Sequence, residues 1–199
     1  PGGRPTRSAC SIATTAHGAV PMSEGNAPEF RVFENREIAA LTLAGELGEI
    51  LESAIEERRA ASLVVSGGTT PAQCFAALAH ADIDWSRVGV LPSDDRWVPG
   101  EHDDSNEKLV RNTLLVNGAA RADLLAFYDG KISVEERAAT LDKEIRFVPF
   151  PFACSLLGMG TDGHFASLFP DAENLDEGLD LESNTLCLPV RTAASPHPC

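Results

Sequence analysis

An aspartate and a histidine two residues apart, Asp162 and His164, are the residues whose types and spacing point most directly to chemistry. They lie in a glycine-rich stretch that includes Gly160 and Gly163 and follows an apolar run at residues 153–157. A histidine titrates near neutral pH, and a carboxylate can orient its ring, so the pair could act as a general base. The glycines allow a tight turn and close approach of a ligand. The structural alternative is a plain strand-to-helix connection in which Asp162 is a helix N-cap.

A second glycine-rich segment follows the apolar run 63–65 and precedes a helix that begins at Pro71, a favourable first helical residue. Main-chain N–H groups at such a position attract anions. The segment has neither the lysine of a P-loop nor the dinucleotide glycine fingerprint, so it predicts a site for a single phosphate. The residues that would hold the phosphate are Ser66, Gly67, Gly68, Thr69 and Thr70. A tight turn with a threonine cap is the structural alternative.

A third polar loop, at residues 92–99, holds Asp94, Asp95 and Arg96 and follows a strand expected at residues 87–91. The planar guanidinium of Arg96 presents a fork of donors that suits phosphate or carboxylate. A surface ion pair is the alternative for this arginine.

Elements that could position these loops alternate along the chain. Strands are expected at residues 30–33, 63–65, 87–91, 124–127, 153–157 and 185–190, and helices at 35–59, 71–80, 105–115 and 133–146. This alternation predicts a single three-layer α/β domain, a mostly parallel sheet with helices on both faces. The loops that follow parallel strands emerge at one edge of the sheet, so the three polar loops can surround one pocket.

The composition argues against some classes of function. The chain has 199 residues, 43% of them hydrophobic, and a net charge of −14, which argues against nucleic-acid binding. It has no apolar run long enough to span a membrane. Residues 1–28 are rich in small polar residues and predict a disordered extension before a domain at 29–199. We expect a cytoplasmic monomer or homodimer that binds a small phosphorylated molecule.

The cysteines and the remaining histidines predict no metal site. The five cysteines are widely spaced and lack the ligand spacing of zinc sites, which fits a reducing cytosol. His17, His80, His102 and His197 have no setting like that of His164 and are interpreted as surface or tail residues. No metal or other cofactor is expected.

Three blocks together resemble the 6-phosphogluconolactonase family, which shares its fold with glucosamine-6-phosphate deaminase. They are residues 66–71, residues 94–99 with Asp104-Ser-Asn106, and residues 157–170. The resemblance covers about residues 30–192. It implies hydrolysis of 6-phospho-D-glucono-1,5-lactone to 6-phosphogluconate in the oxidative pentose phosphate pathway, without a metal.

The resemblance also implies roles for residues. His164 would activate water against the lactone carbonyl, and Asp162 would orient it. The 67–70 loop and Arg96 would hold the 6-phosphate, and Asp94 and Asp95 would line the sugar site. Main-chain N–H groups between Gly158 and Gly163 are candidate oxyanion donors.

Two departures leave alternatives open. Asp95 stands where the family usually has glutamate, and family members continue past residue 199 with elements that supply further basic phosphate contacts. One alternative is therefore an inactive, truncated copy that binds sugar phosphates. The other is a sugar-phosphate isomerase or deaminase, whose Asn-Glu-Pro is replaced here by Leu168-Phe169-Pro170.

Overall fold

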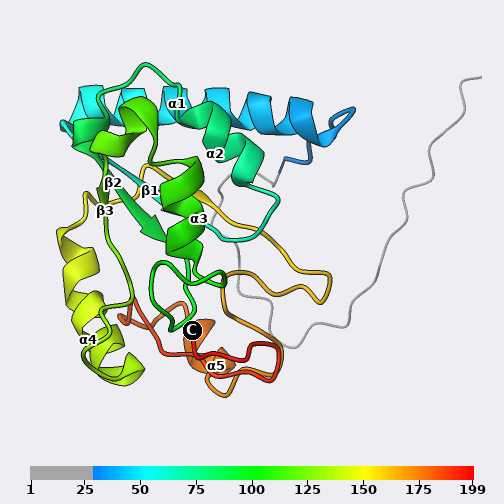
Figure 1. The fold of residues 1–199 in the computed structure, drawn as a ribbon, viewed down its shortest axis with the longest axis vertical. Helices are drawn as coiled ribbons and strands as arrows, with labels where there is room; N and C mark the ends of the chain where they lie inside the picture. Colours follow the sequence, from blue (N-terminus) through cyan, green and yellow to red (C-terminus); the bar gives the residue numbers. More distant parts are fainter. Residues whose placement is uncertain (1–28) are drawn as a thin grey trace, which may run out of the picture. The chain divides into compact units, whose positions relative to one another are not determined.

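The structure, a computed structural model, describes residues 29–199. The expected disordered extension at 1–28 lies outside the described residues. The helices and strands described below all lie in one compact unit, Phe33–Cys199 (Figure 1).

Four parallel strands form the sheet, in the order β3-β2-β1-β4. Their bounds are β1 Ala61–Val65, β2 Val88–Pro92, β3 Asp123–Leu124 and β4 Cys154–Leu156. The expected strands near 63–65, 87–91 and 153–157 are thus confirmed, and the one at 124–127 is limited to two residues. The strand β1 pairs with a neighbour on each side and all of its residues are buried, which explains why all of them except Ser62 are apolar.

Three helices pack on one face of the sheet: α1 Arg36–Arg58, α2 Ala72–Leu78 and α3 Asn106–Thr113. Alternate strand residues, among them Leu63 and Val65, join Leu51 and Phe75 of these helices in the larger apolar core. All four of these side chains are fully buried, and each such burial stabilises the fold by about 1.5–3 kcal/mol.

The opposite face is covered by α4, Val134–Glu144. Val64 and Leu91 point to this side and pack with Leu141 and Ile145 in a second apolar cluster. Figure 1 shows α4 apart from the group formed by α1, α2 and α3. The predicted three-layer arrangement is confirmed. The remaining short helices are α5 Leu175–Gly178 and the 3₁₀ helices Trp85–Arg87, Asn117–Arg121 and Ile145–Phe147.

Polar side chains fix the starts of the longer helices. Asn35 Oδ1 accepts from the N–H of Ile38 at 2.9 Å at the start of α1. Ser133 and Glu136 form a reciprocal capping box at the start of α4. Each cap satisfies main-chain donors that the helix itself leaves unpaired. No described helix has the length and apolar character needed to cross a membrane.

Two expected strands are absent from the described sheet. Residues 30–33 are irregular, and the large side chains of Phe30 and Val32 are exposed. Residues 185–190 are also irregular. The N–H of Leu186 donates to Asp142 on α4, and Val190 exchanges two main-chain hydrogen bonds with Cys199. The main chain of this segment therefore bonds to the side chain of Asp142 and to Cys199, and it does not pair with the edge of the sheet.

Candidate active site

The three polar loops follow three adjacent strands, β2, β1 and β4, and therefore emerge at the same edge of the sheet. Contacts between the loops confirm that they meet. Ser167 Oγ donates to Asp94 Oδ2 at 2.7 Å. A Cβ atom placed on Gly158 would lie 3.8 Å from Ser66 Oγ, so the first and third loops are in contact range. The predicted convergence of the loops is therefore present in the structure.

His164 and Asp162 form a close pair in the turn that follows β4. The distance from His164 Nδ1 to Asp162 Oδ1 is 2.6 Å. The pKa of Asp162 is lowered, chiefly by the hydrogen bond from the His164 side chain. With Nδ1 directed at the carboxylate, the tautomer that this contact favours leaves the Nε2 lone pair to accept a proton. Asp162 does not cap a helix, because the next described helix begins at Leu175.

Glycine at position 160 is required by the position of the His164 ring. A Cβ atom there would lie 2.3 Å from His164 Nδ1 and 2.6 Å from Asp162 Oδ1. Gly163 has φ +89°, a conformation that favours glycine. The N–H groups of Gly160 and Gly163 bond within the turn, to the carbonyls of His164 and Gly160. The N–H groups of Gly160 and Gly163 are therefore not free to bond to a substrate, and these glycines would contact it only by close packing. Any oxyanion donors would have to be other main-chain amides of the turn.

In the loop at residues 66–71, Gly67 lies against the side chain of Asn106. A Cβ atom at this position would lie 1.8 Å from Asn106 Oδ1, so only glycine fits. Gly68 has φ +89°. Thr69 and Thr70 are exposed, and Pro71 is the N-cap of α2 without any side-chain cap. No threonine side chain caps α2, so the threonine-cap alternative does not apply to this loop.

Asp95 is buried, and its carboxylate organises the start of α3. It accepts hydrogen bonds from the N–H groups of Arg96, Asn106 and Glu107 and from Ser105 Oγ, at 2.7–3.3 Å. Burial raises the pKa of Asp95, and these hydrogen bonds act in the opposite direction. Because its oxygens are engaged by the protein, the prediction that Asp95 lines a sugar site gains no support from these contacts.

Asn106 joins the first and second loops and was not among the predicted site residues. Its Nδ2 donates to the carbonyl of Asp94 at 2.8 Å, and its Oδ1 accepts from Arg96 Nη1 at 2.9 Å. Arg96 Nη1 also donates to the carbonyl of Asp104 at 3.1 Å. Among the described residues these bonds engage Nη1, and the other guanidinium donors are available to an anion. Asn106 lies in the second resemblance block, which was the available signal.

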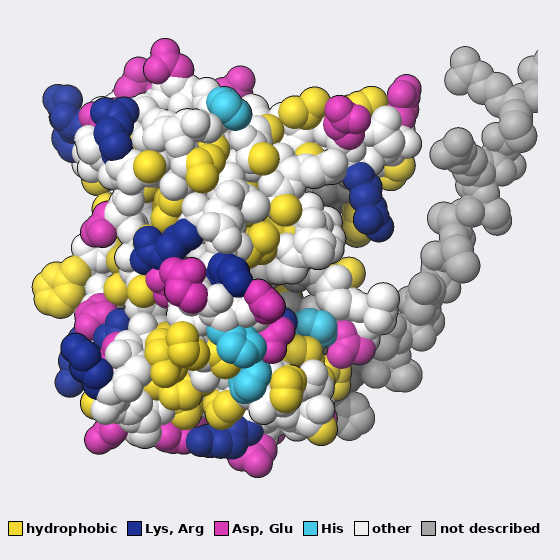
Figure 2. Space-filling view, viewed as in Figure 1, with side chains coloured by type: hydrophobic (Ala, Val, Ile, Leu, Met, Phe, Trp, Pro, Cys, Tyr) yellow, Lys and Arg dark blue, Asp and Glu magenta, His cyan; other side chains and the backbone are white. Residues whose placement is uncertain are grey.

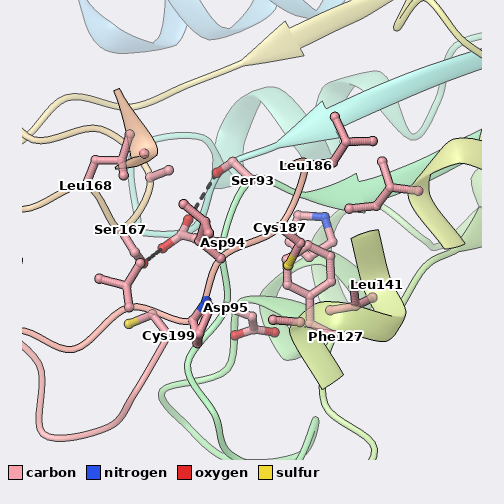
Figure 3. A pocket seen from close by; sticks show the side chains of 18 of the residues that line it. Ser93, Asp94, Asp95, Phe127, Leu141, Ser167, Leu168, Leu186, Cys187 and Cys199 are labelled. Carbon is pink, nitrogen blue, oxygen red and sulfur yellow. Dashed lines mark hydrogen bonds between the residues drawn. The ribbon is translucent and has the colours of Figure 1, made fainter. Parts of the chain in front are cut away.

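Asp94 lies between two serines at the polar end of a cavity. Its carboxylate accepts from Ser93 Oγ at 3.0 Å and from Ser167 Oγ at 2.7 Å, as Figure 3 shows. The cavity measures about 380 Å³, and most of its lining is apolar, with Phe127 and Leu141 among the contributors. Of the predicted site residues, Asp94, Asp95 and Arg96 line it, whereas His164 and residues 66–70 do not. The cavity therefore adjoins the candidate active site through the second polar loop.

A parallel sheet with helices on both faces and polar loops at one edge defines an α/β protein with an edge-of-sheet site. Residues 34–199 match the family described as glucosamine-6-phosphate isomerases/6-phosphogluconolactonase, and the chain belongs to that family. A 6-phosphogluconolactonase of Pseudomonas aeruginosa is 43% identical over 155 residues, which are 78% of this chain and 65% of the relative. One of Mesorhizobium japonicum is 42% identical over 174 residues, 87% of this chain and 73% of the relative.

Solved structures agree with this assignment. A 6-phosphogluconolactonase of Shewanella baltica matches with a TM-score of 0.80 and 36% identity, over 83% of this chain and 70% of that chain. A putative 6-phosphogluconolactonase of Neisseria gonorrhoeae matches with a TM-score of 0.74 at the same identity, over 83% and 72%. The chain thus spans about two thirds of the length of the Pseudomonas relative. The resemblance and the fold class predicted from the sequence are both confirmed.

Proposed function

We propose that the protein hydrolyses 6-phospho-D-glucono-1,5-lactone to 6-phosphogluconate. Family membership supports the reaction class, and many relatives carry the name of this enzyme. The observation that carries the mechanism is the 2.6 Å contact between His164 Nδ1 and Asp162 Oδ1 in the turn after β4. This contact leaves Nε2 of the ring as a base in a partly exposed position.

In the proposed reaction, His164 Nε2 takes a proton from a water molecule while the water oxygen attacks the lactone carbonyl. The carbonyl oxygen then carries negative charge, which main-chain N–H groups of the turn can stabilise. When the tetrahedral intermediate collapses, the bond between the carbonyl carbon and the ring oxygen breaks, and the proton held by His164 passes to that oxygen. Asp162 holds the ring and stabilises its positive charge between the two steps.

The phosphate of the substrate is assigned to the 66–70 loop and Arg96. Gly67 and Gly68 expose the main chain, Thr69 and Thr70 present hydroxyl groups, and the Arg96 guanidinium carries the positive charge. An anchor at the phosphate is remote from the reacting carbon. Its binding energy can therefore position the lactone against His164.

The experiment is a hydrolysis assay with freshly prepared phosphogluconolactone, corrected for spontaneous hydrolysis, alongside glucosamine 6-phosphate assayed for ammonia release. We expect hydrolysis above background and no ammonia. Ammonia release without hydrolysis would assign the chain to the deaminase activity instead. Absence of both, with a thermal shift on adding 6-phosphogluconate, would identify a sugar-phosphate-binding copy without activity.

A further inference from the structure

We propose that His102, Asp104 and His197 form a binding site for a divalent transition-metal ion of the zinc class. Ligand atoms from these three side chains all lie within 4.8 Å of one another. Two imidazoles and one carboxylate are a donor set that zinc binds, with water in the remaining position. The cluster uses none of the residues assigned to lactone hydrolysis, so the proposal stands apart from that function.

Two of the three separations within this cluster are close to those of a metal site. Asp104 Oδ2 lies 3.5 Å from His197 Nε2 and 3.8 Å from His102 Nδ1. Zinc–ligand bonds of about 2.0–2.2 Å in a tetrahedral arrangement place ligand atoms about 3.3–3.6 Å apart. The centroids of the two rings lie 5.6 Å apart and their planes meet at 80°, so binding of one ion by both would include rotation of the rings.

One ring nitrogen of His102 already acts as an acceptor. Its Nδ1 accepts a hydrogen bond from the N–H of Asp104 at 3.1 Å. The lone pair that accepts this bond points at the main-chain amide of Asp104. An ion would take this lone pair in place of the bond to the amide.

Other contacts hold the two contributing segments together. The N–H of Trp97 donates to the carbonyl of Pro198 at 2.6 Å, and Cys199 exchanges two main-chain hydrogen bonds with Val190. Arg96 Nη1 donates to the carbonyl of Asp104. The ligands are therefore presented by segments that already meet, which reduces the ordering cost of binding. A bound ion would tie residues 195–199 to the loop before α3.

All three side chains are partly exposed, at 44% for His102, 52% for Asp104 and 33% for His197, so an ion can enter from solvent. Figure 2 shows two histidine side chains side by side with acidic groups next to them. The competing interpretation is a set of ion pairs between protonated histidines and Asp104, which would require no metal.

The test is a zinc titration of the chelator-treated protein by calorimetry, with a competing chelator to fix the affinity. We expect Asp104→Asn and His197→Gln each to weaken zinc binding about 100-fold or more, since loss of an outer hydrogen-bond partner alone costs 10–100-fold. Wild-type protein should gain thermal stability with zinc, and the Asp104→Asn variant should not. Magnesium should not compete, because two imidazoles disfavour it.

The matched control is Asp103→Asn, which removes one negative charge next to Asp104 in the sequence. The carboxylate of Asp103 pairs with Lys108 and is not part of the proposed site. This variant should bind zinc as the wild type does. His80→Gln is the corresponding control for histidine and should also leave binding unchanged. Equal weakening in Asp103→Asn and Asp104→Asn, or wild-type affinity in both Asp104→Asn and His197→Gln, would overturn the proposal. Circular dichroism of each variant confirms that its affinity is measured on folded protein.

Discussion

Nδ1 of His164 and Oδ1 of Asp162 lie 2.6 Å apart within one short turn, so the orienting carboxylate and the proposed base come from the same loop. The turn is closed by the hydrogen bond from the Gly160 N–H to the His164 carbonyl at 2.8 Å. The geometry of the pair therefore depends on local main-chain structure more than on packing between distant elements. The first two predictions test this dependence.

His164→Ala is expected to lower kcat for lactone hydrolysis by about 10²–10⁴-fold, the usual contribution of a general base. Binding of 6-phosphogluconate should change little, because the phosphate anchor is untouched. The checks are steady-state kinetics and a product-binding titration, with His80→Ala as the control. Turnover close to that of the wild type would show that another group is the base.

Gly160→Ala should reduce kcat nearly as much as His164→Ala, because the new methyl group would occupy the place of the imidazole ring. The matched control is Gly45→Ala in α1, where a Cβ meets nothing within 4 Å and should stabilise the helix by up to about 1 kcal/mol. Kinetics and thermal denaturation of both variants are the measurements. An active Gly160→Ala enzyme would mean that the ring position in the turn is unimportant.

Arg96→Ala should raise KM by about 10–100-fold with a smaller change in kcat, as expected for loss of a charged hydrogen bond worth about 1.5–3 kcal/mol. Arg87→Ala is the control, since Arg87 pairs with Asp84 at the other end of β2. The comparison requires full kinetic curves for both variants. An unchanged KM in Arg96→Ala would remove this residue from the phosphate site.

Asp95→Asn should lower the free energy of unfolding by about 1–3 kcal/mol, because an amide NH₂ would face N–H donors of α3. The folded-state pKa of Asp95 is raised, so its titration favours the folded state most below the ordinary pKa of about 3.9. This contribution is lost as pH rises through the folded-state pKa. The unfolding free energy of wild type minus variant should therefore shrink with rising pH, and a difference that grows would contradict the raised pKa.

The sequence predicted the central sheet well because β1 and β2 are mostly apolar runs, each followed by a serine. It failed at 185–190, where the same kind of run bonds to Asp142 and Cys199 instead of a strand. Apolar patterning reports burial, and it cannot name the partner that covers a segment.

The sequence predicted those parts of the site that depend on residues close together in the chain. Asp162 and His164 are neighbours in sequence, so their pairing could be anticipated. The meeting of His102 and Asp104 with His197 depends on how the chain folds back, and no local spacing reveals it. The structural role of Asp95 was missed because acidic residues beside Arg96 fit a polar site and a buried helix cap equally well.

The position of Asn106 restricts the order in which this protein could acquire substitutions. Its amide fills the space that any side chain at residue 67 would need, and it also holds Arg96. A larger residue at 67 could be accommodated only after Asn106 had been shortened, and that earlier change would by itself release the arginine. Any route to a larger residue at position 67 therefore includes a variant in which the Arg96 guanidinium has lost its bond to Asn106. Substitutions at positions 67 and 106 are for this reason strongly dependent on each other.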